Sequence, residues 1–163
     1  MTLTLRKALH SLNALTELGA EISSDHDFEE VMLTSLHNLL GAFAIPRGAI
    51  AQFVARPRQV KIISAKGLDG AAKQRLTLGR DEVQKLIAHA QPLAVAAENN
   101  GLAQFLARHR DLFALLHAEL MVPVVVRGDL MGLIFLSKKF SRTAYSDAER
   151  ELIHAMAQQI GVA

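Results

Sequence analysis

The segment from residue 108 to residue 111 reads Arg-His-Arg-Asp and carries four ionisable side chains in succession. The guanidinium group of Arg108 or Arg110 can bind a carboxylate or a phosphate through two parallel hydrogen bonds. His117 follows, two residues before Glu119, and its imidazole can ligate haem iron or a metal ion. The alternative is that these side chains form the solvated, charged face of a helix.

A second group of charges lies between Arg56 and Arg80, where seven basic residues accompany Asp69 as the one acid. Such an excess of positive charge attracts an anionic ligand such as a nucleotide or a carboxylate. The alternative is a solvated strand face and loop. No aromatic residue lies between these cations to stack on bases, which argues against binding of single-stranded nucleic acid. The basic residues are Arg56, Arg58, Lys61, Lys66, Lys73, Arg75 and Arg80.

The motifs of common enzymes and metal sites do not occur in this sequence. With no cysteine, the chain has no disulfide, thiolate metal ligand or cysteine nucleophile. Its seven histidines lack the spacings of zinc sites, and no G-x-S-x-G, G-x-G-x-x-G or phosphate-loop motif is found. Ser23, Asp25 and His26 match a catalytic triad by type, but sequence neighbours do not easily reach its geometry. We therefore expect a protein that is not an enzyme, has no preformed metal site and has no assigned cofactor.

Length and composition fit one globular domain. The chain has 163 residues, and half of them are hydrophobic. An excess of two basic residues over acidic ones is too small to predict a nucleic-acid partner. No apolar run reaches the length of about 18 residues that would indicate a membrane span. His10, Glu17 and Glu21 interrupt the apolar residues that a signal peptide would need, so we expect a cytoplasmic protein.

Hydrophobic periodicity predicts the elements that position these residues. Steps of three and four indicate helices, and short β-branched runs between glycine and proline indicate strands. Asp27 and Glu30 form a capping-box-like start after a break at residues 23–26, and Ser146 with Glu149 forms a second box. We expect helices at 4–22, 27–41, 81–89, 102–116 and 147–163, and strands at 49–55, 60–65, 93–96, 119–126 and 130–138.

The last two strands form a hairpin around Arg127-Gly128-Asp129. This tripeptide is also an adhesion motif, but between two apolar strands we interpret it as a turn that supplies positive φ. Pro123 has no backbone donor, so its strand is expected to be bulged or at a sheet edge there.

The two terminal helices carry regular apolar stripes, and each stripe has two possible partners. It can pack on the sheet, or it can pair with a second copy of the chain in a parallel helical dimer. We predict the homodimer, and because the last stripe runs to the end of the chain we expect its helix to continue in a longer protein. The stripes include Leu5, Leu9, Leu12, Ile153, Met156 and Ile160.

In this order the elements resemble a GAF domain over nearly the whole chain. The resemblance is carried by the leading helices, the strand pair ending in Ala65-Lys66-Gly67, the hairpin from Val122-Pro123 to Leu136, and the closing Tyr145-Ser146-Asp147 with Glu149, Leu152 and Ala157. It implies an α+β, profilin-like fold for residues 1–163 as a single domain. A central antiparallel sheet of about six strands would carry the N- and C-terminal helices on one face and a ligand pocket on the other.

The resemblance also implies a sensory and regulatory domain of a bacterial signalling protein. Such a domain binds a small molecule and passes its state through the terminal helices to a covalently linked output domain. The candidate pocket residues are Phe53, Arg108, Phe113 and His117. The alternative is a purely structural dimerisation module without a ligand. A cavity of roughly 300 Å3 or more with converging polar groups would favour sensing, and a space filled by Phe and Leu would favour the alternative.

Absent residues narrow the subclass. Family members that attach a bilin or reduce methionine sulfoxide use cysteine, which this chain lacks. Members that bind cyclic nucleotides carry a dispersed Asn-Lys, Phe, Asp-Glu signature. Here Ser137-Lys138 stands where Asn-Lys is expected, and Tyr145 and Asp147 follow with Glu149 offset, so the match is partial.

Overall fold

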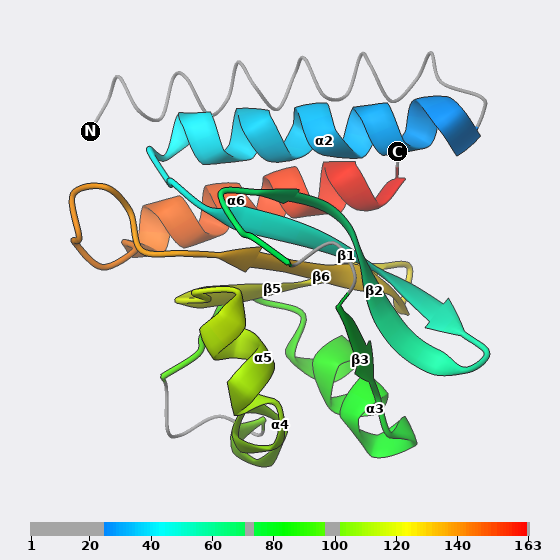
Figure 1. Cartoon of the computed structure of the whole chain (residues 1–163). Coiled ribbons are helices and arrows are strands. Elements are labelled where there is room, and N and C mark those ends of the chain that lie inside the picture. Colours follow the sequence, from blue (N-terminus) through cyan, green and yellow to red (C-terminus); the bar gives the residue numbers. More distant parts are fainter. Residues whose placement is uncertain (1–24, 71–73, 97–101, 163) are drawn as a thin grey trace.

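A computed structural model describes residues 25–70, 74–96 and 102–162. Within these ranges the chain forms one antiparallel sheet of six strands in the order β3-β2-β1-β6-β5-β4 (Figure 1). The predicted α+β fold with about six strands is therefore confirmed. The strands are β1 (Gly48–Ala55), β2 (Arg58–Lys66), β3 (Arg75–Thr77), β4 (Leu93–Ala94), β5 (Leu120–Val126) and β6 (Asp129–Leu136).

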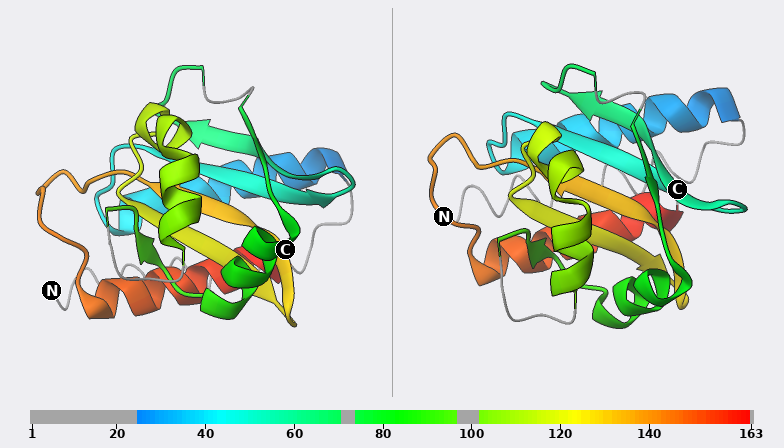
Figure 2. Two further views of the ribbon diagram at one scale, coloured as in Figure 1. Left: turned by 90° about the horizontal axis from the view of Figure 1, so that it is seen from below. Right: turned by 60° about the horizontal axis from the view of Figure 1, so that its bottom comes forward.

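Helices cover both faces of this sheet. The long helices α2 (Asp25–Ala42) and α6 (Asp147–Val162) lie above it in Figure 1. Three short helices lie below, and Figure 2 shows them in front of the sheet when it is viewed from that side. They are α3 (Arg80–His89), α4 (Ala103–Arg108) and α5 (Arg110–Leu115). No helix in the described ranges is long and apolar enough to cross a membrane.

Side chains that alternate along the central strands build one core on each face. On β5, Leu120 and Val122 pack with α2 and α6, whereas Met121 between them belongs to the core on the side of the short helices. On β6, Ile134 and Leu133 are divided in the same way. The sheet thus separates the two long helices from the short ones, as predicted.

The start of α2 differs from the prediction. The helix already includes Asp25, so the predicted break does not extend that far, and Asp27 lies inside the helix rather than at its N-cap. Acidic side chains are favourable within the first turn of a helix as well as at its N-cap. The presence of Asp27 therefore did not identify the first residue of α2. The predicted helix at 4–22, with Leu5, Leu9 and Leu12, lies outside the described residues.

The capping box predicted for α6 is confirmed. Glu149 N donates to Ser146 Oγ at 3.1 Å, and Ser146 N donates to Glu149 Oε1 at 2.9 Å. The predicted use of the α6 stripe in a dimer is wrong, because Ile153, Met156 and Ile160 are buried in the core between α6, α2 and the sheet. This face of α6 therefore has its partner within the same chain.

The hairpin of β5 and β6 closes with Arg127 and Gly128, both at positive φ, as the sequence predicts. Pro123 pairs with Leu133 of β6, while the short strand β4 pairs only with the start of β5, so among the described residues β5 is an edge strand at its proline. Two features were missed: the three-residue strand β3, and a break at His109 that divides the expected helix 102–116 into α4 and α5.

Candidate ligand-binding site

The centre of the sheet face below β1, β5 and β6 is filled by side chains. The ring of Phe113 lies 6.0 Å from that of Phe105 and 5.8 Å from that of Phe135, measured between centroids. Leu133 and Met121 are buried in the same core. A ligand therefore has no room at the centre of this face unless these residues move.

Space opens instead beside α4 and α5, next to the end of β4. This region, here called the edge hollow, has a volume of about 650 Å3. Its apolar wall includes Leu106, Phe113 and Val95, together with several alanines. Arg110, His117 and Glu119 supply its polar groups. Both its size and its mixed lining are typical of small-molecule sites.

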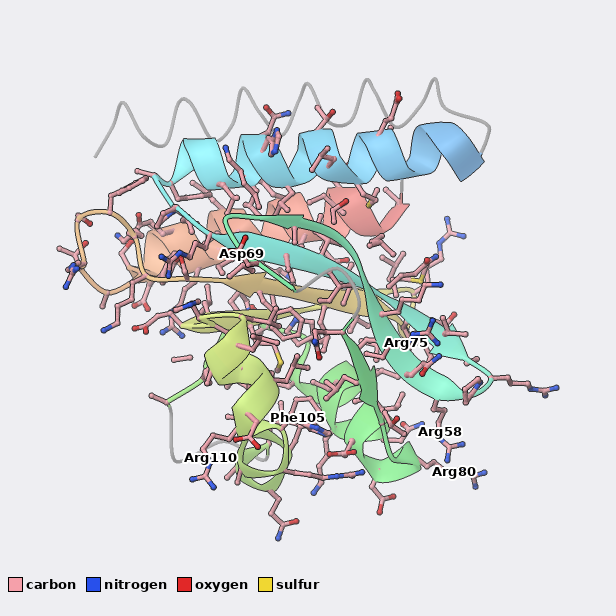
Figure 3. All side chains as sticks on the ribbon, in the orientation of Figure 1. Arg58, Asp69, Arg75, Arg80, Phe105 and Arg110 are labelled. Carbon is pink, nitrogen blue, oxygen red and sulfur yellow. The ribbon has the colours of Figure 1, made fainter. Side chains whose placement is uncertain are left out.

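One helical face supplies four of the eleven lining residues. Arg110, Phe113, Ala114 and His117 follow one another at steps of three, one and three, which brings them to one side of α5 and its C-terminal turn. Arg110 lies at the end of α5 farther from the sheet (Figure 3). At the other end, His117 adopts a φ of 50° and turns the chain into β5.

The structure brings together only two of the four predicted pocket residues. Phe113 and His117 both line the edge hollow. Arg108 projects elsewhere, with its side chain 57% exposed and its Nη1 only 2.7 Å from Glu82 Oε1. Phe53 is half-buried on β1 and packs against the core on the side of the short helices, without lining the hollow. Their roles in ligand binding stay predictions.

Arg110 replaces Arg108 as the cation that lines this hollow. The two arginines are two residues apart, so on one continuous helix they would already point in different directions. The spacing 110, 113, 114 and 117 was the sequence signal that could have selected Arg110. Nothing in the sequence pointed to Val95, which reaches the hollow because β4 pairs with β5.

Arg108 instead helps to join α3 to α4. Glu82 Oε1 accepts hydrogen bonds from Arg108 Nη1 and, at 2.8 Å, from the backbone nitrogen of Gly79 at the start of α3. Glu82 Oε2 lies 3.3 Å from Nε2 of His109, whose side chain is only 10% exposed. Burial lowers the pKa of His109, and the neighbouring Glu82 carboxylate partly opposes that shift.

The described parts of the basic segment, residues 56–70 and 74–80, do not line the edge hollow. Leu78 N donates to the carbonyl oxygen of Arg58, and Arg75 pairs with Lys61 across the two strands. Figure 3 shows Arg58, Arg75 and Arg80 near the β1–β2 turn and the start of α3, well away from Arg110. Both the anion-binding and the solvated-face interpretations of this segment stay open.

Three residues of the partial cyclic-nucleotide signature, Ser137, Tyr145 and Glu149, form structural contacts. Lys139 Nζ lies 2.8 Å from Glu149 Oε1 and 3.1 Å from Oε2, and both side chains are nearly buried. The Tyr145 hydroxyl donates to the carbonyl oxygen of Ser137, and burial raises the pKa of this phenol. Burial alone would raise the pKa of Glu149, but hydrogen bonds from Lys139 and Ser146 outweigh it and hold the pKa below its usual value. These groups fasten the loop after β6 to α6.

No group of three or more His, Asp or Glu side chains positioned to hold a metal ion occurs among residues 25–70, 74–96 and 102–162. The lining of the edge hollow combines an apolar wall with the polar side chains of Arg110, His117 and Glu119.

Comparison with known proteins agrees with this architecture. The model of the GAF domain family matches residues 27–163, so the chain belongs to the GAF domain family. No curated protein sequence is similar enough to count as a relative. Solved structures with the same fold share at most 20% identity with this chain in the three cases that follow, and they support the fold alone.

The GAF domain of an Acinetobacter phosphoenolpyruvate-protein phosphotransferase matches with a TM-score of 0.65 and 18% identity, covering 94% of this chain and 89% of that one. The nlh2 GAF domain of A. aeolicus in an inactive state matches with a TM-score of 0.63 and 20% identity, covering 97% of this chain and 95% of that one. Residues 122 to 287 of a methyl-accepting chemotaxis protein match with a TM-score of 0.66 and 18% identity, covering 88% of this chain and 92% of that one.

Proposed function

We propose that this chain is a non-enzymatic sensory domain that binds a small molecule in the edge hollow and passes its bound state to α6. The edge hollow itself carries the proposal. It holds an apolar wall and three converging polar residues on the sheet face opposite the two long helices. A molecule with an apolar body and an anionic group would find Phe113 and Leu106 along one side and Arg110 at one end.

The context of similar structures supports a regulatory role in a cytoplasmic, bacterial-type signalling protein. Similar domains come from a methyl-accepting chemotaxis protein, a phosphoenolpyruvate-protein phosphotransferase and a far-red cyanobacteriochrome photoreceptor. In that arrangement the domain would be joined to an output domain in the parent chain. Homodimer formation stays part of the proposal through the predicted N-terminal stripe of Leu5, Leu9 and Leu12, which lies outside the described residues.

Strand β5 offers a route for transmission. His117 and Glu119 line the hollow and lead directly into β5, where Met121 faces the same side of the sheet. The next residue, Val122, packs on the opposite side with α6. A ligand that favours one position of β5 would therefore bias the position of α6, provided that it binds the two positions with different affinity.

A purely structural module is the second candidate. The observation that favours it is the filled centre of the sheet face, where Phe105, Phe113 and Phe135 leave no room for a ligand. In that case the edge hollow would be a surface groove without a specific occupant.

Native mass spectrometry of freshly purified protein, followed by titration with 8-anilinonaphthalene-1-sulfonate, distinguishes the two. The aromatic rings of this dye can pack on the apolar wall, and its sulfonate can bind Arg110. We expect one saturable site in the wild type and at least about tenfold weaker binding in Ala114→Trp, which fills the hollow. Gln104→Trp, an exposed position on α4 that does not line the hollow, is the matched control. Equal dye binding by all three proteins, with no retained molecule, would favour the structural module.

A further inference from the structure

A second hollow, here called the cationic hollow, lies on the other side of His117 and Glu119, which line both spaces. It has a volume of about 630 Å3. Its walls come from the segment before β1, the loop after β6 and the corner between α5 and β5. Figure 1 shows this loop projecting beyond the start of α6.

The lining of this hollow is rich in positive charge. Four of its nine lining residues are arginine or lysine, and Glu119 is the one acid among the nine. Lys139 is neutralised by Glu149. The other cations, Arg47, Lys138 and Arg142, are exposed and form no ion pair within the described part of the chain. Three uncompensated cations facing one carboxylate would attract an anion of more than one charge.

Hydrogen bonds made by backbone atoms fix the walls, together with the ion pair between Lys139 and Glu149. Arg47 N donates to Ser137 Oγ at 3.2 Å, and Ser137 N donates to the Arg47 carbonyl oxygen at 3.1 Å. Phe140 N donates to the carbonyl oxygen of Ala44, and Arg142 N donates to that of Lys139, each at 2.9 Å. The cations therefore project from a built frame and are free to engage a ligand.

Backbone strain is concentrated at the same place. The described chain has five non-glycine residues at positive φ, and three of them border this hollow: Ala44 at 53°, His117 at 50° and Arg142 at 59°. Such conformations persist where the surrounding structure enforces them, and they cluster at binding sites.

An aromatic side chain completes the lining. Phe140 is 73% exposed, although large apolar side chains are normally covered. Its ring offers a surface on which the organic part of a ligand can pack beside the cations.

We propose that the cationic hollow binds a phosphomonoester whose organic part packs on Phe140. A phosphoryl group carries nearly two negative charges at neutral pH, matching the surplus of cations better than a single carboxylate does. Arg47 and Arg142 can each donate two hydrogen bonds to its oxygens. This site is separate from the proposed sensing site, although His117 and Glu119 line both hollows.

Titration calorimetry with phenyl phosphate tests the proposal directly, with inorganic phosphate and benzoate as companion probes. We expect phenyl phosphate to bind at one site, and both companions to bind more weakly. Arg142→Ala and Lys138→Ala should each weaken phenyl phosphate binding about tenfold. Phe140→Ala should lower the affinity for phenyl phosphate to that for inorganic phosphate. The same variant should bind inorganic phosphate as the wild type does.

Two variants serve as controls. Lys85→Ala removes one positive charge from an exposed position on α3 and should leave binding unchanged. Ala114→Trp fills the edge hollow and should still bind phenyl phosphate, which separates this site from the sensing site. The proposal is overturned if phenyl phosphate does not bind at millimolar concentration, if benzoate binds equally well, or if Lys85→Ala weakens binding as much as Arg142→Ala.

Discussion

At the scale of single residues, Glu149 connects three parts of the chain. Its carboxylate binds Lys139 in the loop after β6 and the backbone of Ser146, while its own backbone nitrogen binds the Ser146 hydroxyl. Lys139 is nearly buried, so removing the carboxylate would leave an ammonium group without its partner in a place where water reaches it poorly.

Glu149→Ala is expected to lower the free energy of unfolding by about 3 kcal/mol, because it removes both the helix cap and the partner of Lys139. Urea unfolding followed by circular dichroism measures this change. Glu151→Ala alters an exposed position of the same helix and should cost less than about 0.5 kcal/mol. Equal losses in the two variants would contradict the role assigned to Glu149.

His109 is expected to make stability depend on pH. Its pKa is lowered in the folded state by burial, so the folded protein binds this proton less readily than the unfolded chain does. The stability that depends on neutral His109 is therefore present above the unfolded-state pKa of about 6.5, and it is lost as the pH falls through the folded-state pKa.

Urea unfolding at pH 7.5 and pH 5.5 should show the wild type losing more stability than His109→Gln, which cannot take up a proton. Burial also lowers the pKa of His89, so the stability of His109→Gln should still depend on pH, but less than that of the wild type. His37→Gln, at an exposed position of α2, should behave like the wild type. An identical loss in wild type and His109→Gln would refute the assignment.

At the scale of elements, close packing fixes α6 against β5. A Cβ atom added at Gly161 would lie 2.6 Å from a methyl group of Val124 and 2.8 Å from one of Val126. The last turn of α6 therefore approaches β5 as closely as a glycine allows. If the strand moves, this turn has to move with it.

Gly161→Val is expected to destabilise the domain by about 2 kcal/mol, since the added side chain has to displace two valines. Gly41→Ala is the matched control, because no atom outside its own helix lies within 4 Å of its added Cβ. That change should be neutral or stabilise by up to about 1 kcal/mol. Thermal unfolding of both variants measures the difference, and an undisturbed midpoint in Gly161→Val would show that the contact is looser than described.

Periodicity predicted most elements because each of them buries one regular face. It could not predict β3, whose three residues contain only one buried side chain, Leu76. Nor could it predict the break at His109, where the chain turns between two helices of six residues each. Phe113 and His117 line the same hollow because they lie on one side of α5 and its C-terminal turn, and their role in ligand binding stays a prediction. Spacing could have favoured Arg110 over Arg108, but the ion pair of Arg108 with Glu82 of α3 could not be predicted, because the two residues lie far apart in the sequence.

At the scale of the whole molecule, the sheet divides the domain into a face covered by the two long helices and a face covered by the three short ones. The apolar stripe of α6 showed that this helix packs against something, but a stripe alone does not identify its partner. Ile153 is fully buried within the same chain, so the space that a second copy would have used is occupied by the sheet and α2.

Ile153→Asp should therefore unfold the domain rather than split a dimer. A carboxylate placed in this core without a partner should cost more than about 4 kcal/mol. Ile153→Val keeps the site apolar and should cost about 1 kcal/mol. Circular dichroism should show Ile153→Asp to be unfolded. If light scattering instead showed a folded monomer in place of a wild-type dimer, the stripe would be an intermolecular surface and this account would be wrong.

The central claim is that occupancy of the edge hollow is sensed by α6 across the sheet. The chain has no cysteine, so Ala114→Cys can be modified at this position alone with a benzyl methanethiosulfonate reagent that fills the hollow. Hydrogen exchange followed by mass spectrometry is then compared with Gln104→Cys carrying the same group on the exposed surface of α4.

We predict that modification at position 114 changes exchange in β5 and throughout residues 147–162, that a reductant reverses the change, and that modification at position 104 does neither. Complete modification at position 114 with unaltered exchange in α6 would contradict the account.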